Sequence, residues 1–144
     1  MEPSLFSKII GGEIPASFVA KGDDWVAFLD INPRREGHTL VVPVQQVQRL
    51  ADLHPSSITS LWQGVQQVQE ILSNYFETSD FSIVVHDGPL AGQEIPHVHI
   101  HLIPRTANDG GKSILSMWPH SPMPGEKDPD FSALSELSRK LGGG

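Results

Sequence analysis

Cysteine is absent from this sequence, and its absence excludes disulfides, thiol nucleophiles and thiolate metal sites. Positive charge is scarce as well, with 10 Lys and Arg against 17 Asp and Glu and a net charge of −7. The basic residues form no block and do not alternate with aromatic side chains, so nucleic acid is a poor candidate partner. A small anionic ligand stays open, because histidines and backbone dipoles can bind anions against the overall charge.

Long hydrophobic runs are missing too. No apolar run approaches the ~20 residues that span a bilayer, and residues 1–10 lack the basic-then-apolar pattern of a signal peptide. We therefore expect no membrane partner, no secretion and a cytoplasmic location. The 144 residues fit one domain, 1–144, with a core at about 4–106 and a tail at 107–144.

Hydrophobic periodicity predicts where helices and strands lie. After Pro55, apolar residues recur every three to four positions, which is typical of a long helix with one buried stripe. The predicted stripe comprises Ile58, Leu61, Trp62, Val65, Val68, Leu72 and Tyr75. A short helix that ends at glycine is predicted at 6–12, and a tail helix at 130–141. Strands are predicted at 18–21, 25–30, 38–42, 81–86 and 97–103.

Residues 97–103 read His-Val-His-Ile-His-Leu-Ile and hold three of the chain's seven histidines. Side chains of a strand alternate between its faces, so His97, His99 and His101 would project from one side and the aliphatic residues from the other. Neighbouring imidazoles would start roughly 6–7 Å apart, near enough to share a ligand or pass a proton. The run therefore predicts a strand with chemistry on one face and core on the other.

Three interpretations of this cluster compete. Histidine titrates near neutral pH, which favours covalent or acid–base catalysis. Three neutral imidazoles could instead hold a catalytic zinc ion. The third interpretation is a half-exposed strand whose histidines only fill space. Catalysis by imidazole is the interpretation that we favour.

The loop before the histidines, residues 87–96, reads Asp-Gly-Pro-Leu-Ala-Gly-Gln-Glu-Ile-Pro. Gly92 permits backbone conformations in which successive N–H groups turn toward one point, and such concavities bind phosphate oxygens. Taken alone, these glycines would more often mark ordinary turns. Their place directly before three imidazoles favours the phosphate-binding interpretation.

These residues resemble the histidine triad (HIT) superfamily of nucleotide hydrolases and transferases, whose signature is three histidines that alternate with apolar residues. The run 97–103 matches this signature at every position. Residues 6–15 and 27–31 resemble the Hint and bacterial Hit branch. Residues 87–89, 91–93 and 104–105 resemble the fragile histidine triad branch.

The resemblance implies an α+β fold with a five-stranded antiparallel sheet, one long helix and a short N-terminal helix. It implies cleavage at the α-phosphate of nucleoside phosphoramidates or dinucleoside polyphosphates, through a nucleotide bound covalently to a histidine. It also implies a homodimer in which Trp118 and the tail complete the partner's site. No cofactor and no metal are expected. A nucleotide-binding module with little turnover and a three-histidine zinc hydrolase are the alternatives.

The resemblance also implies a role for each site residue. His99 would be the nucleophile, flanked by His97 and by His101, which would assist the leaving group, and His38 would be the family's fourth histidine. Asp30 would hold the ribose hydroxyls, and Gln93 with its neighbour Gly92 would supply backbone donors to the phosphate. The nucleobase pocket would comprise Phe6, Ile9, Phe28, Leu29 and Ile31.

The sequence departs from the family pattern at two places. His86 stands where the family usually has Asn or Gln beside the scissile phosphate, and Glu94 stands where Ser or Thr is usual. Glu94 could point away, pair with His86 or select an unusual substrate. Ser4, Ser7 and Gln46 stand where many bacterial relatives carry ligands of a structural zinc ion, so we expect no zinc there.

Overall fold

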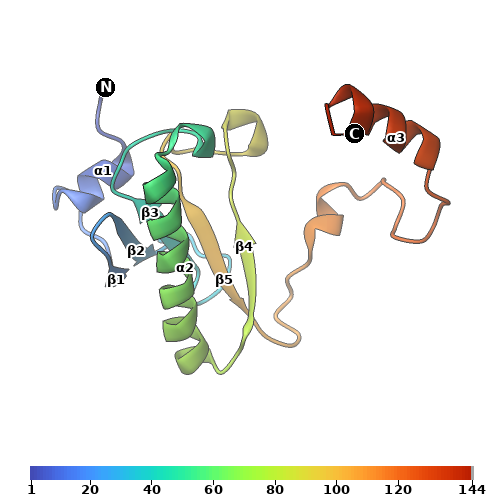
Figure 1. Cartoon of the computed structure of the whole chain (residues 1–144). Coiled ribbons are helices and arrows are strands. Elements are labelled where there is room, and N and C mark those ends of the chain that lie inside the picture. The colour runs from blue at the N-terminus through green and yellow to red at the C-terminus, as the bar shows by residue number, and fades with distance from the viewer. Residues whose placement is uncertain (144) are drawn as a thin grey trace. The chain divides into compact units, whose positions relative to one another are not determined.

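The computed structural model describes residues 1–143, and an antiparallel sheet of five strands is its centre (Figure 1). The order of the strands in the sheet is β1-β2-β3-β5-β4. Their bounds are β1 Phe18–Lys21, β2 Trp25–Leu29, β3 Thr39–Pro43, β4 Asp80–Val84 and β5 Ile100–Arg105. The predicted α+β class, the five-stranded antiparallel sheet and both helices of the core are confirmed.

The long helix α2, Pro55–Phe76, covers one face of the sheet. Pro55 stands in its first turn, where a missing N–H costs nothing. The buried stripe contains Leu61, Val65, Val68 and Leu72 and packs on Val41, Val98, Ile100 and Leu102 of the sheet. Trp62 and Tyr75 are exposed, so the sequence prediction was wrong to include them. Trp62 follows Leu61 by one residue and is therefore turned about 100° away from the stripe.

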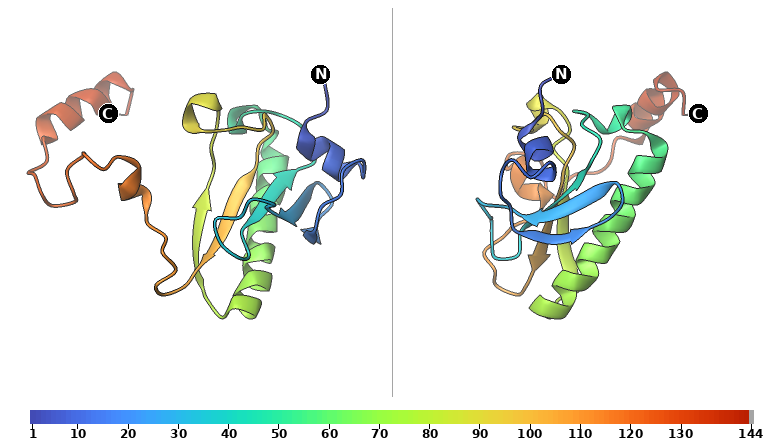
Figure 2. Two further views of the ribbon diagram at one scale, coloured as in Figure 1. Left: turned by 180° about the vertical axis from the view of Figure 1, so that it is seen from behind. Right: turned by 90° about the vertical axis from the view of Figure 1, so that its left-hand side faces the viewer.

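A short helix, α1 Leu5–Ile10, covers part of the opposite face. Ser4 caps it by accepting a hydrogen bond from the Ser7 amide. Phe6 and Ile9 are its buried residues, and they form a second apolar cluster with Val26, Phe28, Leu40 and Val42. Figure 2 shows α1 and α2 on opposite sides of the sheet, so the sheet separates two cores.

Three strands are shorter than predicted, and the histidines lie where they end. β5 begins at Ile100, so His97 and His99 precede it, because the Val98 amide donates to Val47 O instead of to a neighbouring strand (2.8 Å). His38 lies directly before β3, and His86 lies two residues after β4. His97, His99 and His86 therefore lie at one end of the sheet, while His38, at the other end of β3, lies beside His101 within β5.

The chain divides into two compact units, and the second begins at Gly110. It contains the short 3-10 helix η3, Ile114–Met117, and the helix α3, Phe131–Lys140, which lies within the predicted range 130–141. Every described residue of this unit is exposed. None of the helices formed by residues 1–143 has the length and apolar character needed to cross a bilayer.

Candidate active site

The three histidines of the run share one face of the sheet. Val98, Ile100 and Leu102 are buried in the core under α2. The rings of His97 and His99 contact Phe6 of α1 on the other face, at centroid distances of 5.8 Å and 4.9 Å. The alternation read from the sequence is therefore present, and it begins three residues before the strand itself.

His97 is fully buried, and both of its ring nitrogens are engaged. Its Nε2 lies 2.8 Å from Pro43 O, which can only accept, so Nε2 carries the proton. Nδ1 then accepts a hydrogen bond from Ser4 Oγ at 2.6 Å. Burial lowers the pKa of this ring, which is therefore neutral. His97 holds the backbone in place, and no nitrogen of it is free for a phosphate or a metal ion.

Ser4, Ser7 and Gln46 form a polar cluster around His97. Gln46 Oε1 accepts from the Ser4 amide at 2.8 Å and from Ser7 Oγ at 2.6 Å. Ser4 Oγ accepts from the Ser7 amide at 3.0 Å while it donates to His97. The hydroxyl and amide groups of these three residues therefore satisfy one another.

His99 presents a free nitrogen from a fixed ring. Its Nδ1 lies 2.8 Å from His97 O, so Nδ1 carries the proton and Nε2 keeps its lone pair. The edge-on ring of Phe6 packs against it. Burial lowers the pKa of His99, which keeps the ring neutral near pH 7. A neutral, anchored imidazole with one free lone pair is the form that can attack phosphorus.

His38 and His101 form a second pair, with His38 Nε2 2.9 Å from His101 Nδ1. The Arg34 amide donates to His38 Nδ1 at 3.0 Å, so His38 carries its proton on Nε2 and donates it to His101. His101 then carries its own proton on Nε2. Burial and three neighbouring histidines lower the pKa of His101 to about 4, and burial lowers the pKa of His38 more than Asp30 raises it.

Asp30, His38 and His101 place one ligand atom each within 4.8 Å of one another, close enough for a metal ion. The tautomers oppose this use, because Nε2 of His38 carries a proton and has no lone pair to offer. Moving that proton to Nδ1 would set it against the Arg34 N–H. The donor set does not fit a metal ion in this geometry.

His86 forms a cluster of four imidazoles with His38, His99 and His101. Its ring centroid lies 5.4 Å from that of His101, which in turn lies 5.0 Å from that of His99. The side chain is half-buried, and within residues 1–143 neither ring nitrogen makes a hydrogen bond. Of the three possibilities considered for Glu94, its pairing with His86 is not found among residues 1–143, where Glu94 is exposed and has no ion-pair partner.

The loop before the triad includes the 3-10 helix η2, Pro89–Ala91, and bends at Gly88 and Gly92, both with positive φ. The amides of Gly92 and Gln93 donate to Pro89 O and Gly88 O, at 3.0 and 3.2 Å. The loop thus uses both amides for its own turns, and their role as donors to a phosphate stays a prediction. The Gln93 side chain is buried and donates to Gln48 O at 2.8 Å.

The residues expected to hold the nucleoside divide into three groups. Phe6, Ile9 and Phe28 form a buried apolar cluster beside His99. Ile31 is 87% exposed, while alternation along β2 places Leu29 on the face opposite Phe28, so Leu29 lies outside this cluster. Asp30 Oδ1 accepts from the Asn32 amide at 2.8 Å, and Oδ2 lies 3.5 Å from His38 Nε2.

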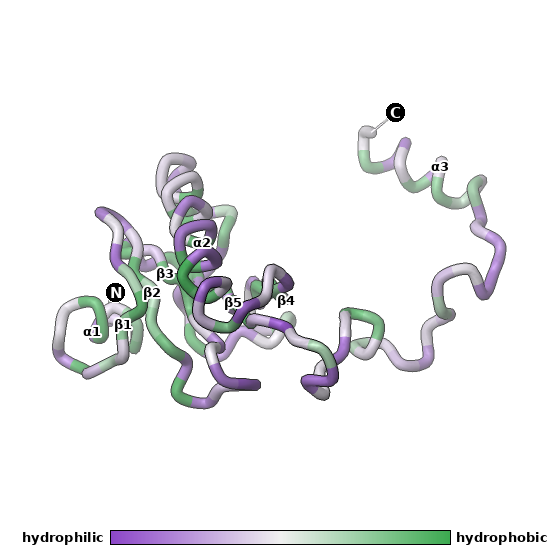
Figure 3. The backbone as a smooth tube through the Cα atoms, turned by 90° about the horizontal axis from the view of Figure 1, so that it is seen from below, coloured by the Kyte–Doolittle hydropathy of each residue, from purple (hydrophilic) through white to green (hydrophobic). Residues whose placement is uncertain are grey.

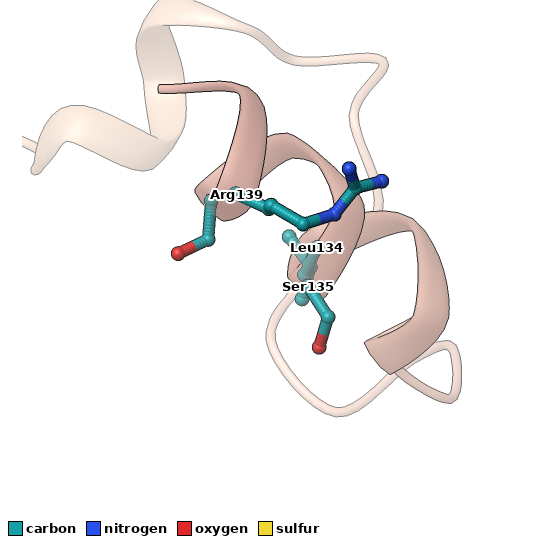
Figure 4. A pocket seen from close by; sticks show the side chains of 4 residues that line it. Leu134, Ser135 and Arg139 are labelled. Carbon is teal, nitrogen blue, oxygen red and sulfur yellow. The ribbon is translucent and has the colours of Figure 1, made fainter. Parts of the chain in front are cut away.

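A surface hollow on α3 is unrelated to this chemistry. Leu134, Ser135, Ser138 and Arg139 line it, and all four come from the one helix (Figure 4). Its lining contains no imidazole and no carboxylate, so no base that could activate the two serine hydroxyls lies among these four residues.

The sequence interpretation missed the groups that set the tautomers of the histidines. They are the carbonyls of Pro43 and His97, the amide of Arg34 and the hydroxyl of Ser4. Three of these are backbone groups, which carry no side-chain signal in a sequence. Ser4 was noted only as a departure from a zinc-binding pattern.

The fold and the cluster define an α+β protein whose candidate site is a set of neutral histidines on one sheet face. Residues 11–108 match the HIT domain family, and the chain belongs to this family. It is 45% identical over 89 residues to the asymmetrical bis(5'-nucleosyl)-tetraphosphatase of Schizosaccharomyces pombe, a match of 62% of this chain and 49% of that protein.

A second relative is the adenosine 5'-monophosphoramidase of Saccharomyces cerevisiae, 30% identical over 137 residues, which are 95% of this chain and 79% of that protein. A crystal structure from Streptococcus mutans has a TM-score of 0.84 and 30% identity, and covers 98% of this chain and 84% of that one. The named relatives are nucleotide hydrolases, and they include both of the enzyme classes that the sequence resembles.

Proposed function

We propose that this HIT-family protein hydrolyses nucleotides at the α-phosphate through a nucleotidyl group bound covalently to His99. The observation that carries the proposal is the His99 ring, whose Nδ1–H is held by His97 O while Nε2 stays free. A carbonyl that fixes the tautomer and the ring plane leaves one lone pair aimed in one direction. In-line displacement at phosphorus depends on such positioning more than on bond-making assistance.

The reaction divides into two displacements. In the first, His99 Nε2 forms a bond to the α-phosphorus as the bond from phosphorus to the leaving group breaks. In the second, water adds to phosphorus, the bond to Nε2 breaks, and a nucleoside monophosphate is released. Phosphoramidates and dinucleoside polyphosphates are the proposed substrates, because relatives named for each class are similar to this chain. Nothing in this sequence of steps requires a metal ion.

Replacement of the nucleophile tests the proposal. His99→Ala should abolish turnover on a panel of phosphoramidates and dinucleoside polyphosphates, because it removes the imidazole whose Nδ1–H is held by His97 O and whose Nε2 is the proposed nucleophile. Binding of a mononucleotide should stay measurable as a rise in melting temperature. His54→Asn, an exposed histidine at the α2 N-cap, is the matched control and should keep full activity. Retention of more than a few per cent of wild-type turnover in His99→Ala would contradict the assignment.

Chelation separates catalysis by imidazole from catalysis by zinc. We expect prolonged dialysis against a chelator to leave the rate unchanged, because both nitrogens of His97 are bonded within the chain and His38 Nε2 is protonated. The measurement is the rate before and after dialysis, together with elemental analysis. If chelation removed the activity and added zinc restored it, the result would support the three-histidine zinc hydrolase instead.

We also propose that the chain works as a cytoplasmic homodimer with a nucleotide as its small-molecule partner. The second unit exposes Ile114, Trp118, Phe131 and Leu134, each by more than half of its surface. Exposed apolar side chains of this number mark a protein contact more often than a free surface. Binding without turnover is the alternative, and release of nucleoside monophosphate from any member of the panel would eliminate it.

A further inference from the structure

The proposed reaction needs a source for the proton that the leaving group takes up. When the bond to the leaving group breaks, that group departs with an electron pair and needs a proton unless it is already a stable anion. His97, His99, His38 and His101 are all kept neutral by burial. With a pKa of about 4, His101 is an imidazolium in roughly one molecule in a thousand near pH 7. Its Nε2–H can donate a hydrogen bond but is a poor source of a proton.

His86 occupies the position from which a proton could come. It continues the alternation of β4, in which Val84 lies opposite His101, so His86 lies on the histidine face. Its ring is tilted 52° to that of His101 at a centroid distance of 5.4 Å. The loop closes over it, since a Cβ on Gly92 would lie 3.6 Å from His86 Nδ1.

His86 is also the ring of this cluster whose tautomer no hydrogen bond among residues 1–143 fixes. Carbonyls and amides hold His97, His99 and His38 in one tautomer each. No such partner among residues 1–143 holds His86, so no hydrogen bond there fixes one of its nitrogens as the donor. The next residue, Asp87, accepts from the Leu50 amide at 2.9 Å through its carboxylate, and Glu94, later in the same loop, is exposed. The imidazoles of His99 and His101 face it from β5 and the residues before it.

We propose that His86 is a catalytic residue that donates a proton to the leaving group and then accepts one from water. This inference rests on the proposed function and adds to it. In the first displacement, the Nε2–P bond forms at His99, the bond from phosphorus to oxygen or nitrogen breaks, and the imidazolium of His86 protonates the departing atom. In the second, neutral His86 takes a proton from the water that attacks phosphorus, and His99 Nε2 leaves. Each turnover returns His86 to its charged form.

A proton donor at this place selects a class of substrate. The amide side chains of Asn and Gln can donate a hydrogen bond to a leaving group but cannot transfer a proton to it. With His86 the site suits leaving groups that are strongly basic as anions, such as alkylamines and alkyl alcohols. Substrates whose leaving group departs as a stable anion gain little from it.

Two substrates that differ only in the leaving group test the proposal. One is an adenosine monophosphate amide of an alkylamine, and the other is an adenosine monophosphate ester of an acidic phenol. For His86→Gln we expect the single-turnover rate of leaving-group release to fall about 10²-fold on the amide, the usual size of a general-acid effect, and less than about threefold on the phenyl ester. Release of the leaving group is the step measured, because both substrates share the later hydrolysis of the nucleotidyl-His99 intermediate. His54→Gln is the matched control and should change neither rate.

The outcomes separate this inference from the proposed function. An equal loss on both substrates, or no loss on either, would overturn the role of His86 and leave the role of His99 untouched. Turnover by His99→Ala would overturn the proposed function itself. If His86→Gln does not fold, as judged by its melting temperature with a mononucleotide, the wild-type rate on amides of increasingly basic amines gives the answer. A shallow dependence on amine basicity supports protonation by the enzyme, and a steep one contradicts it.

Discussion

At the scale of single residues, the site is a set of histidines whose protons are placed by the backbone. The Pro43 and His97 carbonyls and the Arg34 amide each bond one ring, and each can only accept or only donate. The result is that His99 offers a lone pair while His101 offers an N–H. Two histidines two residues apart thus present opposite functions at their free nitrogens.

The buried histidines make stability depend on pH. His101 binds a proton with a pKa of 6.5 when unfolded and about 4 when folded. Between those values the unfolded chain binds more protons, so the free energy of unfolding decreases as pH falls from about 7 toward 4. Allowing for partial exposure of the ring, the loss from His101 is on the order of 2 kcal/mol. His38, His97 and His99 add losses of the same sign.

Urea unfolding at pH 7.5 and pH 5 measures this loss. We expect a clearly lower midpoint at pH 5, and we expect the difference to shrink in His101→Gln, which has no group that titrates there. Equal midpoints at the two pH values in the wild type would show that the rings are not held neutral by burial.

At the scale of elements, the close approach of α2 to β2 positions the sheet that carries the site. Trp25 is buried against Gly64 in the middle of the helix, where a Cβ would lie 2.6 Å from the indole ring. Gly22 also lies against this ring, since a Cβ there would be 2.0 Å from Trp25 Nε1. The helix interior normally favours Ala over Gly, and here the contact reverses that preference.

Gly64→Ala should therefore destabilise the protein by about 1–3 kcal/mol, the usual cost of overpacking a core. The measurement is the free energy of unfolding in urea. Gln66→Ala, on the exposed side of the same helix, is the control and should be neutral or slightly stabilising. A stabilised Gly64→Ala variant would mean that the helix and Trp25 can separate at little cost.

At the scale of the whole molecule, the second unit has no core of its own. Phe131, Leu134 and Leu137 of α3 and its C-cap residue Leu141 recur at helical spacing, and all four are at least half exposed. Figure 3 shows apolar and polar residues alternating along this helix. An amphipathic helix of ten residues with nothing buried gains stability only when its apolar stripe is covered.

We expect the full chain to sediment at twice the 15.8 kDa of one chain at micromolar concentration, because a second copy would cover this stripe. Leu134→Glu combined with Leu137→Glu should shift the equilibrium toward the monomer, since charge on the stripe opposes its burial. Ser132→Glu on the same helix is the control. A wild-type protein that stays monomeric at tens of micromolar would contradict the homodimer.

Much of this protein was already determined by its sequence. The period-two run at 97–103 separated a histidine face from an apolar face, and the period of 3.6 residues after Pro55 identified α2. Both signals are local, because they depend only on how side chains project from a regular backbone. The same locality explains the errors. Trp62 and Tyr75 suit the composition of a buried stripe, but only packing determined where its edge lies.

Only the tertiary structure decided which hydrogen bonds connect the residues of the site. Ser4 meets His97 across 93 positions of the chain, and His38 meets His101 across 63. Whether a histidine presents a lone pair or a proton depends on which backbone group folds against its other nitrogen, and no local pattern contains that information. The sequence determined which chemical groups share a face, and the long-range hydrogen bonds decided which of their nitrogens can react.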